Sequence, residues 1–265
     1  MGFRNWQDLS SSAIAALDPA RAVAVLPLAA TEQHGPHLPT GTDFQIAEGL
    51  LAEAARRAPA GLDAVLLPPL AIGSSAEHAR FPGTLSVSAA LLTEAIVAIG
   101  ESVARAGLRK LVLVSAHGGN VSAMMNAALE CRSRYRIVAA TLTFARLGLP
   151  AGLVNPEEIA LGVHGGLIET ALMLHFRPDL VDMGKAENFA SLQAGLAERF
   201  SHLRAHGPIG FGWLAGDLNP QGVTGNAAGA TARIGAAVAA HQAAALVDVL
   251  AELAGADVAS LIKDD

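Results

Sequence analysis

The alternation of short, continuous apolar runs with helical segments constrains the fold more than any other feature of the chain. The apolar runs are residues 22–28, 62–67, 110–115 and 136–142, and helical patterns cover 44–57, 88–105 and 121–134 between them. Continuous apolar strands of this length are typical of parallel sheets that are covered on both faces. The order therefore predicts an α/β fold in which a mostly parallel sheet lies between two helical layers.

We expect one domain over residues 1–265, with a three-layer α/β/α architecture. A length of 265 residues suits one large domain, and the chain has no internal repeat and no low-complexity linker. Residues 185–225 are rich in Gly and in loop signals. This region is expected to form an irregular lobe or lid instead of a second domain.

Composition and charge exclude several classes of protein. The chain is 52% hydrophobic and 16% charged, which is incompatible with disorder. The net charge of −6 and the lack of Lys/Arg runs predict no nucleic-acid partner and no anionic membrane surface as partner. Cys131 is the single cysteine, so it forms no internal disulfide, and its helical setting favours core packing.

Membrane insertion and secretion are likewise not expected. The most apolar long segment, residues 234–254, contains His241, Asp248 and Glu252, so no charge-free run of about 18 apolar residues exists. The N-terminal residues are polar and lack the apolar core of a signal peptide. We therefore expect a cytoplasmic protein.

Histidines and carboxylates gather where two of the predicted strands end. The strand at 22–28 runs into a loop with Glu32, His34 and Asp43, and the strand at 110–115 runs into His117. Ligand sites of open parallel sheets lie at the carboxyl ends of the strands. Two imidazoles and two carboxylates without a thiolate suit Zn²⁺, Mn²⁺ or Fe²⁺. The sequence therefore predicts a divalent metal centre, with two ions per protomer if Asp43 bridges them.

Each of these residues also has a structural interpretation. Asp43 could merely cap the helix that begins at residue 44, and Glu32 could be a solvated loop acid. Their convergence at adjacent strand ends favours the metal centre.

A third segment, residues 162–175, places Glu169 within an apolar run. A carboxylate in such surroundings is costly unless it is paired, protonated or bound to a cation. On one continuous helix, His164 would point about 140° away from Glu169. His164 is therefore expected in the Gly-Gly loop at the helix start, where it can donate a proton. The alternative is an ordinary core helix with Glu169 on its polar edge.

The remaining histidines and Asn120 have weaker signals. His37, His78 and Asn120 lie in or next to the same loops and are candidates for substrate binding. The other four histidines have no supporting neighbours and are expected to be solvated: His175, His202, His206 and His241. Gly-rich nucleotide loops and the GxSxG elbow of serine hydrolases are absent from the sequence.

Four segments in this order and spacing resemble the creatininase (creatinine amidohydrolase) family along residues 20 to 235. They are TEQHGPHLPTGTD at 31–43, FPGT at 81–84, HGGN at 117–120 and HGGLIET at 164–170. The resemblance implies a single α/β domain around a binuclear metal centre. It also implies that Glu32, His34, Asp43 and His117 are ligands, with Asp43 bridging. Family members hydrolyse small cyclic amides or formamides, one branch trims a peptide precursor of a redox cofactor, and many are homo-oligomers, with hexamers common.

The chain departs from creatininase itself at two points. The position of creatininase's metal-binding acid, two residues after the HGGN-type histidine, is Gly119 here, so Glu169 is the candidate for the missing carboxylate. Creatininase also places tryptophans before the His164 motif, whereas the tryptophans of this chain are Trp6 and Trp213. A substrate other than creatinine is therefore expected.

Together these observations predict a metal-dependent amidohydrolase that cleaves a non-peptide C–N bond of a small-molecule amide with metal-activated water. His164 would protonate the leaving nitrogen, and Glu169 would serve as ligand, base or both. One alternative is a creatininase-family peptidase that acts on a modified peptide. Another is a non-catalytic small-molecule-binding α/β protein, which would pair its carboxylates with Arg or Lys.

Overall fold

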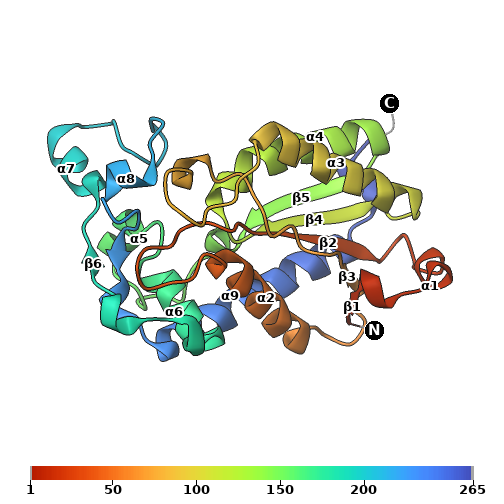
Figure 1. The fold of residues 1–265 in the computed structure, drawn as a ribbon. Helices are drawn as coiled ribbons and strands as arrows, with labels where there is room; N and C mark the ends of the chain where they lie inside the picture. Colours follow the sequence, from red (N-terminus) through yellow and green to blue (C-terminus); the bar gives the residue numbers. More distant parts are fainter. Residues whose placement is uncertain (1, 264–265) are drawn as a thin grey trace.

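The computed structural model describes residues 2–263 and is built around a five-stranded sheet (Figure 1). The strands lie in the order β1-β3-β2-β4-β5, and every neighbouring pair is parallel. Their bounds are β1 Phe3–Asn5, β2 Val23–Leu28, β3 Ala64–Leu66, β4 Lys110–Ser115 and β5 Val138–Thr143. The predicted α/β fold with a parallel sheet is confirmed, and β1 is an edge strand that the apolar pattern did not reveal.

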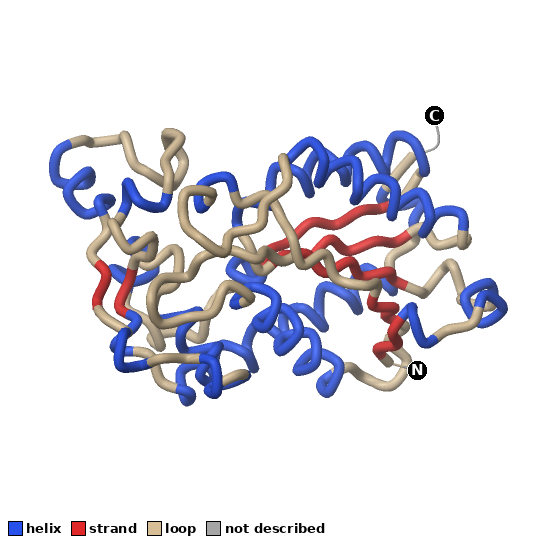
Figure 2. The backbone as a smooth tube through the Cα atoms, in the orientation of Figure 1, coloured by secondary structure: helices blue, strands red, loops and turns tan. Residues whose placement is uncertain are grey.

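Long helices cover both faces of the sheet (Figure 2). The helices α3 (Ala89–Arg105) and α4 (Val121–Tyr135) cover one face, and α2 (Thr42–Arg57), α6 (Leu167–Phe176) and α9 (Ala232–Gly255) cover the other. Alternate residues of a strand point to opposite faces, so Val23 and Val25 enter the α2/α6/α9 core while Ala24 and Leu26 enter the α3/α4 core. The shorter helices are α1 Ser11–Ala15, α5 Pro156–Leu161, α7 Leu192–Arg199, α8 Ala215–Leu218 and α10 Val258–Leu261.

Local chemistry sets several of the element boundaries. The Ser88 hydroxyl accepts a hydrogen bond from the Leu91 backbone N–H and begins α3, as its cap preference predicts. The helix α4 ends at Tyr135, and the φ of 57° at its C-cap Arg136 is left-handed, so β5 begins at Val138 and not at residue 136. The helix α2 begins at Thr42, two residues before the predicted start, and the Gln45 N–H donates to the carbonyl of its N-cap Gly41 at 3.0 Å.

The region 185–225 forms a lobe beside the carboxyl edge of the sheet (Figure 1). It contains α7, α8 and the strand β6 (Asn188–Phe189), which pairs antiparallel with β7 (Gly225–Asn226). Its apolar residues form two small clusters apart from the main cores, one around Phe189 and one around Leu196. The expectation of an irregular lobe is confirmed.

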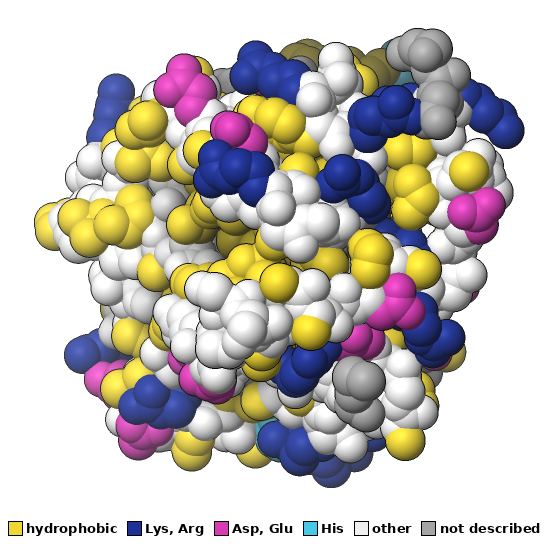
Figure 3. All heavy atoms as spheres, turned by 90° about the vertical axis from the view of Figure 1, so that its right-hand side faces the viewer, with side chains coloured by type: hydrophobic (Ala, Val, Ile, Leu, Met, Phe, Trp, Pro, Cys, Tyr) yellow, Lys and Arg dark blue, Asp and Glu magenta, His cyan; other side chains and the backbone are white. Residues whose placement is uncertain are grey.

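The face at the amino ends of the strands lies opposite this lobe (Figure 3). Basic and acidic side chains are interspersed on it, with hydrophobic side chains between them.

The helix α9 is the one helix of the described residues long and apolar enough to cross a membrane, with a mean hydropathy of 1.6 over its most apolar window. Nine of its residues are buried, and it packs against α2 and α6, so it is a core helix.

The contact between α6 and α9 depends on Gly235. A Cβ atom there would lie 1.9 Å from the carbonyl oxygen of Ala171, so the two backbones approach too closely for any side chain. We expect Gly235→Ala to lower the free energy of unfolding by more than about 1 kcal/mol, because the helices must separate.

Chemical denaturation measures this change, and Gly195→Ala is the matched control. Gly195 lies within α7 with open space around its Cβ position, so its replacement should raise the free energy of unfolding by up to about 1 kcal/mol. Equal effects of the two substitutions would contradict the close-contact argument.

Candidate metal centre

Four buried side chains converge at the carboxyl ends of β2 and β4. Glu32 and His34 lie in the loop after β2, Asp43 lies in the first turn of α2, and His117 follows β4. Their exposed fractions are 0% for Glu32, 1% for His34 and for Asp43, and 5% for His117. The loop is closed by a 2.9 Å hydrogen bond from the Glu32 N–H to the Thr40 carbonyl, which brings its end back to the sheet. The sequence predicted this convergence.

Asp43 lies between the two histidines. Its Oδ1 atom is 3.3 Å from His34 Nε2, and its Oδ2 atom is 3.6 Å from His117 Nδ1. The N-cap of α2 is Gly41, and Asp43 is buried instead of serving as a solvated cap. Likewise, Glu32 Oε1 lies 3.1 Å from His117 Nδ1, so Glu32 is not a solvated loop acid. The structure therefore favours the metal-site interpretation of both carboxylates.

Glu169 reaches the same centre from α6. Its Oε2 atom is 3.8 Å from His34 Nε2 and accepts a 2.6 Å hydrogen bond from the Gly165 backbone N–H. It lies in the first turn of α6, whose following residues are buried. The structure thus brings Glu169 to the position where the sequence analysis required a further carboxylate.

The donor atoms fall into groups that can each hold a cation. One group is Glu32, Asp43 and His117, and a second is His34, Asp43 and Glu169, so Asp43 belongs to both. A third group joins Glu32, His34 and His164. The atoms within each group lie within 4.8 Å of one another, and carboxylate oxygen with imidazole nitrogen is a donor set for Zn²⁺, Mn²⁺ or Fe²⁺.

Unpartnered polar atoms support a cation at this position. Both carboxylate oxygens of Glu32, Oδ2 of Asp43 and Nε2 of His34 are buried with no hydrogen-bond partner among the described residues. Buried polar atoms without partners are rare in native proteins and costly. Among residues 2–263, the ion pairs of Glu32, Asp43 and Glu169 involve histidines and no Lys or Arg. The alternative of a non-catalytic binding protein predicts Lys or Arg partners for these carboxylates, so the observed pairing with histidines argues against it.

Backbone carbonyls set which nitrogen of each histidine faces the centre. His34 Nδ1 donates to the Glu32 carbonyl at 3.0 Å, and His117 Nε2 donates to the Ser74 carbonyl at 2.9 Å. These hydrogen bonds leave His34 Nε2 and His117 Nδ1 as the donor atoms for a cation. Such outer hydrogen bonds orient ligating histidines in known metal sites.

Electrostatics in the cation-free protein are dominated by the mutual pairing of these groups. Burial lowers the pKa of His34 and His117, but the Asp43 and Glu32 carboxylates outweigh it and raise the values to about 10 and about 9. Burial raises the pKa of Asp43. Burial opposes ionisation of Glu32 as well, but pairing with His117 and the other histidines holds its pKa well below the usual range.

His164 lies beside the centre, with its ring centroid 4.2 Å from that of His34 and 4.1 Å from that of His78. Its Nε2 donates to the Gln33 carbonyl at 2.8 Å, and its Nδ1 is 3.6 Å from Glu32 Oε1. Burial, together with the charges of His34 and His78, lowers the pKa of His164 to about 3. In the cation-free protein this low pKa favours the neutral imidazole, with Nδ1 unprotonated and facing Glu32.

His78, the second histidine of this cluster, is buried and faces Glu32. Its Nε2 lies 3.5 Å from Glu32 Oε1, and its Nδ1 accepts a hydrogen bond from the Gln33 side-chain amide at 2.8 Å. Burial lowers the pKa of His78 to about 4. Its contact with substrate stays a prediction.

The other two candidates for substrate binding hold the loops in place. His37 Nε2 is 2.9 Å from Thr170 Oγ1, and its ring stacks on Phe189. The Asn120 side chain donates to the Ala29 carbonyl and accepts from the Ser74 N–H, both at 3.0 Å. His37 Nδ1 is buried with no hydrogen-bond partner among the described residues, and substrate contacts of His37 and Asn120 stay predictions.

The histidines expected to be solvated are exposed at positions 175, 202 and 241. His206 differs: it is half-buried in the lobe, its Nε2 has no hydrogen-bond partner among the described residues, and burial lowers its pKa. The reason is the packing of the 185–225 lobe around it, which no local pattern reveals. Cys131 is buried in the α3/α4 core as expected, and burial raises its pKa to about 11.

Sequence reasoning missed two side chains of the centre. Glu77 Oε1 lies 3.6 Å from His117 Nε2, and burial raises the pKa of Glu77. The Gln33 side-chain amide donates to the Gly222 carbonyl at 2.6 Å and so joins the first loop to the lobe. Glu77 directly precedes His78, which is the signal that could have revealed it.

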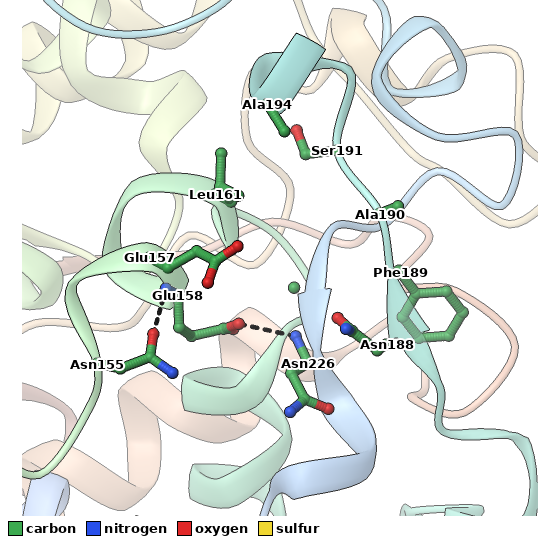
Figure 4. A pocket seen from close by; sticks show the side chains of 11 residues that line it. Asn155, Glu157, Glu158, Leu161, Asn188, Phe189, Ala190, Ser191, Ala194 and Asn226 are labelled. Atoms are coloured by element: carbon green, nitrogen blue, oxygen red, sulfur yellow. Dashed lines mark hydrogen bonds between the residues drawn. The ribbon is translucent and has the colours of Figure 1, made fainter. Parts of the chain in front are cut away.

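Glu158 of α5 holds together the segments around the loop that carries His164, and Figure 4 shows its hydrogen bond with Asn226. Its Oε1 accepts from the Leu167 N–H at 2.9 Å, and its Oε2 accepts from the Asn226 N–H at 2.8 Å. It also lines a cavity of about 270 Å³ between α5 and the β6–β7 ribbon. One buried carboxylate therefore joins α5, the start of α6 and β7.

We expect Glu158→Gln to lower the free energy of unfolding by about 1–3 kcal/mol, because the new amide group faces a backbone N–H and leaves it unpaired. Denaturant unfolding measures this change, together with hydrogen exchange of the Leu167 and Asn226 amides. Glu157→Gln is the matched control, since Glu157 is the exposed neighbour on the same helix. Equal unfolding midpoints for the two variants would show that Glu158 has no clamping role.

Binding of two divalent cations per protomer at pH 7 should release about two protons, one each from His34 and His117, because both pKa values lie well above 7 and ligating nitrogens must be unprotonated. For the same reason the affinity for each cation should rise with pH, by roughly tenfold per unit between pH 7 and 9. Calorimetric titration of chelator-treated protein, in buffers of different ionisation enthalpy, counts the protons. His202→Ala is the control and should leave the count unchanged. Cation binding without proton release at pH 7 would contradict ligation by these histidines.

Comparisons with known proteins identify similar sequences and folds. The family model described as creatininase, creatinine amidohydrolase, matches residues 7–250. A mycofactocin precursor peptide peptidase of Mycolicibacterium smegmatis is 37% identical over 187 residues, 70% of this chain and 69% of the relative. The protein of that name from Mycobacterium ulcerans is 34% identical over 213 residues, 78% and 76% of the two chains. A creatinine amidohydrolase of Pseudomonas putida is 32% identical over 180 residues, 62% and 67% of the two chains.

Solved creatininase structures share the fold. One creatinine amidohydrolase (creatininase) superposes with a TM-score of 0.77 at 23% identity, covering 94% of this chain and 96% of that chain. A manganese form of creatininase superposes with a TM-score of 0.76 at 24% identity, covering 94% and 97%. A mutant creatininase of Zn–Zn type has the same fold, with a TM-score of 0.75 at 24% identity, covering 94% and 97%. With a family match over nearly its whole length, the chain belongs to the creatininase family.

Proposed function

We propose that the protein is a metal-dependent peptidase that cleaves a modified precursor peptide. Two relatives with 34% and 37% identity over at least 70% of this chain are named mycofactocin precursor peptide peptidases. The creatinine amidohydrolase relative is less similar, at 32% identity over 62% of the chain. These relationships favour the peptide alternative over the predicted cleavage of a small non-peptide amide.

The contact of Glu169 with His34 is the observation that carries the proposal. The resemblance to creatininase assigns the corresponding acid to position 119, which is glycine here. A Cβ atom at Gly119 would lie 2.4 Å from both His117 Nε2 and the Ser74 carbonyl, so no side chain fits there. A further carboxylate ligand would therefore come from Glu169 of α6, which would distinguish this chain from creatininase itself.

The positions of the two tryptophans also support a substrate other than creatinine. Trp6 packs at the α3/α4 core, and Trp213 packs on the Leu196 cluster of the lobe. Neither lines the cavity that contains Glu169. An aromatic wall of the kind that creatininase uses is therefore not supplied by tryptophan in this chain.

The donor set fits a divalent cation, which supplies polarisation of the amide carbonyl and a lowered pKa of water when bound. Glu32, Asp43 and His117 would hold one ion, and His34, Asp43 and Glu169 would hold a second. The unprotonated Nδ1 of His164 would hydrogen-bond the attacking water and pass its proton directly to the leaving nitrogen, so that the C–O bond forms as the C–N bond breaks and no charged imidazolium accumulates. Its Nε2–H stays hydrogen-bonded to the Gln33 carbonyl, which fixes the ring orientation.

The test compares three substrate classes on protein loaded with manganese, zinc or iron: a modified precursor peptide, creatinine and a linear formamide. We expect the highest kcat/KM for the peptide. Glu169→Ala should lower kcat/KM by more than about 100-fold and also reduce the bound metal, because a ligand is lost. Glu198→Ala is the control, since Glu198 is exposed in the lobe.

Faster turnover of creatinine or the formamide would instead support the non-peptide amidohydrolase. Full activity and metal content in Glu169→Ala would overturn the assignment of Glu169.

A further inference from the structure

An apolar cavity of about 330 Å³ lies directly beside the candidate metal centre. Glu169 is part of its wall. So are Ala116, which precedes His117, and Ile46, which lies one turn after Asp43 on α2. The cavity and the centre therefore share a wall. A substrate whose amide group reaches the centre has this cavity as its neighbouring space.

The rest of the described wall is almost entirely apolar. Phe144, Leu149, Ile168 and Leu172 line it, together with glycines of the His164 loop. The polar side chains of the described wall are Glu169, which faces His34, and Gln242, which is buried and donates to the Gly148 carbonyl at 3.3 Å. The cavity thus lacks a spare charged group that could bind a charged substituent.

Apolar side chains also surround the open side of this cavity. Ile159 is 54% exposed and Val163 is 39% exposed, and both line the cavity. Large exposed apolar side chains next to a cavity are typical of ligand-binding surfaces. A volume of about 330 Å³ is at the lower end of the usual range for ligand pockets, which suits one side chain and not a long segment.

We propose that this cavity is the specificity pocket of the enzyme and takes one large aliphatic or aromatic group attached next to the scissile amide bond. The inference rests on the proposed hydrolysis of a peptide, and it names the kind of residue that the peptide presents. Burial of a leucine-sized or phenylalanine-sized group should make binding about 10- to 100-fold tighter than burial of a methyl group.

Ala145 offers a way to block the cavity without touching the centre. It lies in the 3₁₀ turn Phe144–Leu147, is exposed, and lines the cavity. A tryptophan at this position would occupy the entrance while the buried core stays intact. Ala151 is the matched control, because it is exposed on the same connection but does not line the cavity.

The test measures the binding of three hydroxamic acids to manganese-loaded protein by calorimetry. Their shared hydroxamate group chelates the cation, and their tails are methyl, isobutyl and benzyl. In the natural protein and in Ala151→Trp, the isobutyl and benzyl compounds should bind at least about tenfold more tightly than the methyl compound. In Ala145→Trp, this preference should fall below about threefold while the affinity of the methyl compound is retained.

Equal affinities of the three compounds in the natural protein would overturn the proposal, as would a preference that persists in Ala145→Trp or a failure of all three to bind. The proposed peptidase activity is judged separately by turnover. Peptide cleavage without a tail preference would refute the pocket alone. A tail preference without cleavage of any peptide would refute the peptidase alone.

Discussion

The structure depends on two carboxylates, Glu32 and Asp43, that are buried at the carboxyl edge of the sheet without a Lys or Arg partner in residues 2–263. A buried ionised carboxylate is strongly destabilising unless a cation or hydrogen-bond donors compensate it. Here the compensation comes from His34 and His117. In the cation-free protein their protonated rings pair with the carboxylates, and the same rings would serve as ligands to a bound cation. One set of side chains thus serves two electrostatic states.

The fold provides the rigidity that this arrangement needs. Parallel strands end at one edge, so the loops after β2 and β4 start side by side. Backbone carbonyls orient the imidazoles, and the buried Glu158 carboxylate ties the His164 loop to α5 and β7. Each support lies outside the donor set. The donor atoms are therefore held in place by several segments at the carboxyl edge of the sheet and not by one motif alone.

The position of Glu169 on α6 also affects the surroundings of the candidate metal centre. The acid enters from α6, while Gly119 leaves no room for a side chain behind His117. Ile168 and Leu172, on either side of Glu169 in α6, form part of an apolar wall beside the centre. The carboxylate that approaches His34 and the apolar cavity beside it thus belong to one helix, so the polarity of this cavity depends on the same element that positions Glu169.

The sequence by itself determined the parallel α/β sheet and the convergence of Glu32, His34, Asp43 and His117. Apolar runs of strand length report burial on both faces, and parallel strands necessarily end at one edge. The family motifs identified Glu169 and His164 as members of the site. These residues could be assigned to one site from the sequence because the strand ends and the order of the motifs can be read along the chain.

Only the tertiary structure decided the chemistry of these side chains. The neutral state of His164 follows from its burial against His34 and His78, and the approach of Glu77 to His117 follows from the packing of two distant loops. The half-buried state of His206, the edge strand β1 and the apolar cavity beside Glu169 likewise arise from contacts between segments far apart in the chain. Burial and the distances between charges set pKa values and pocket polarity, and local residue patterns encode neither.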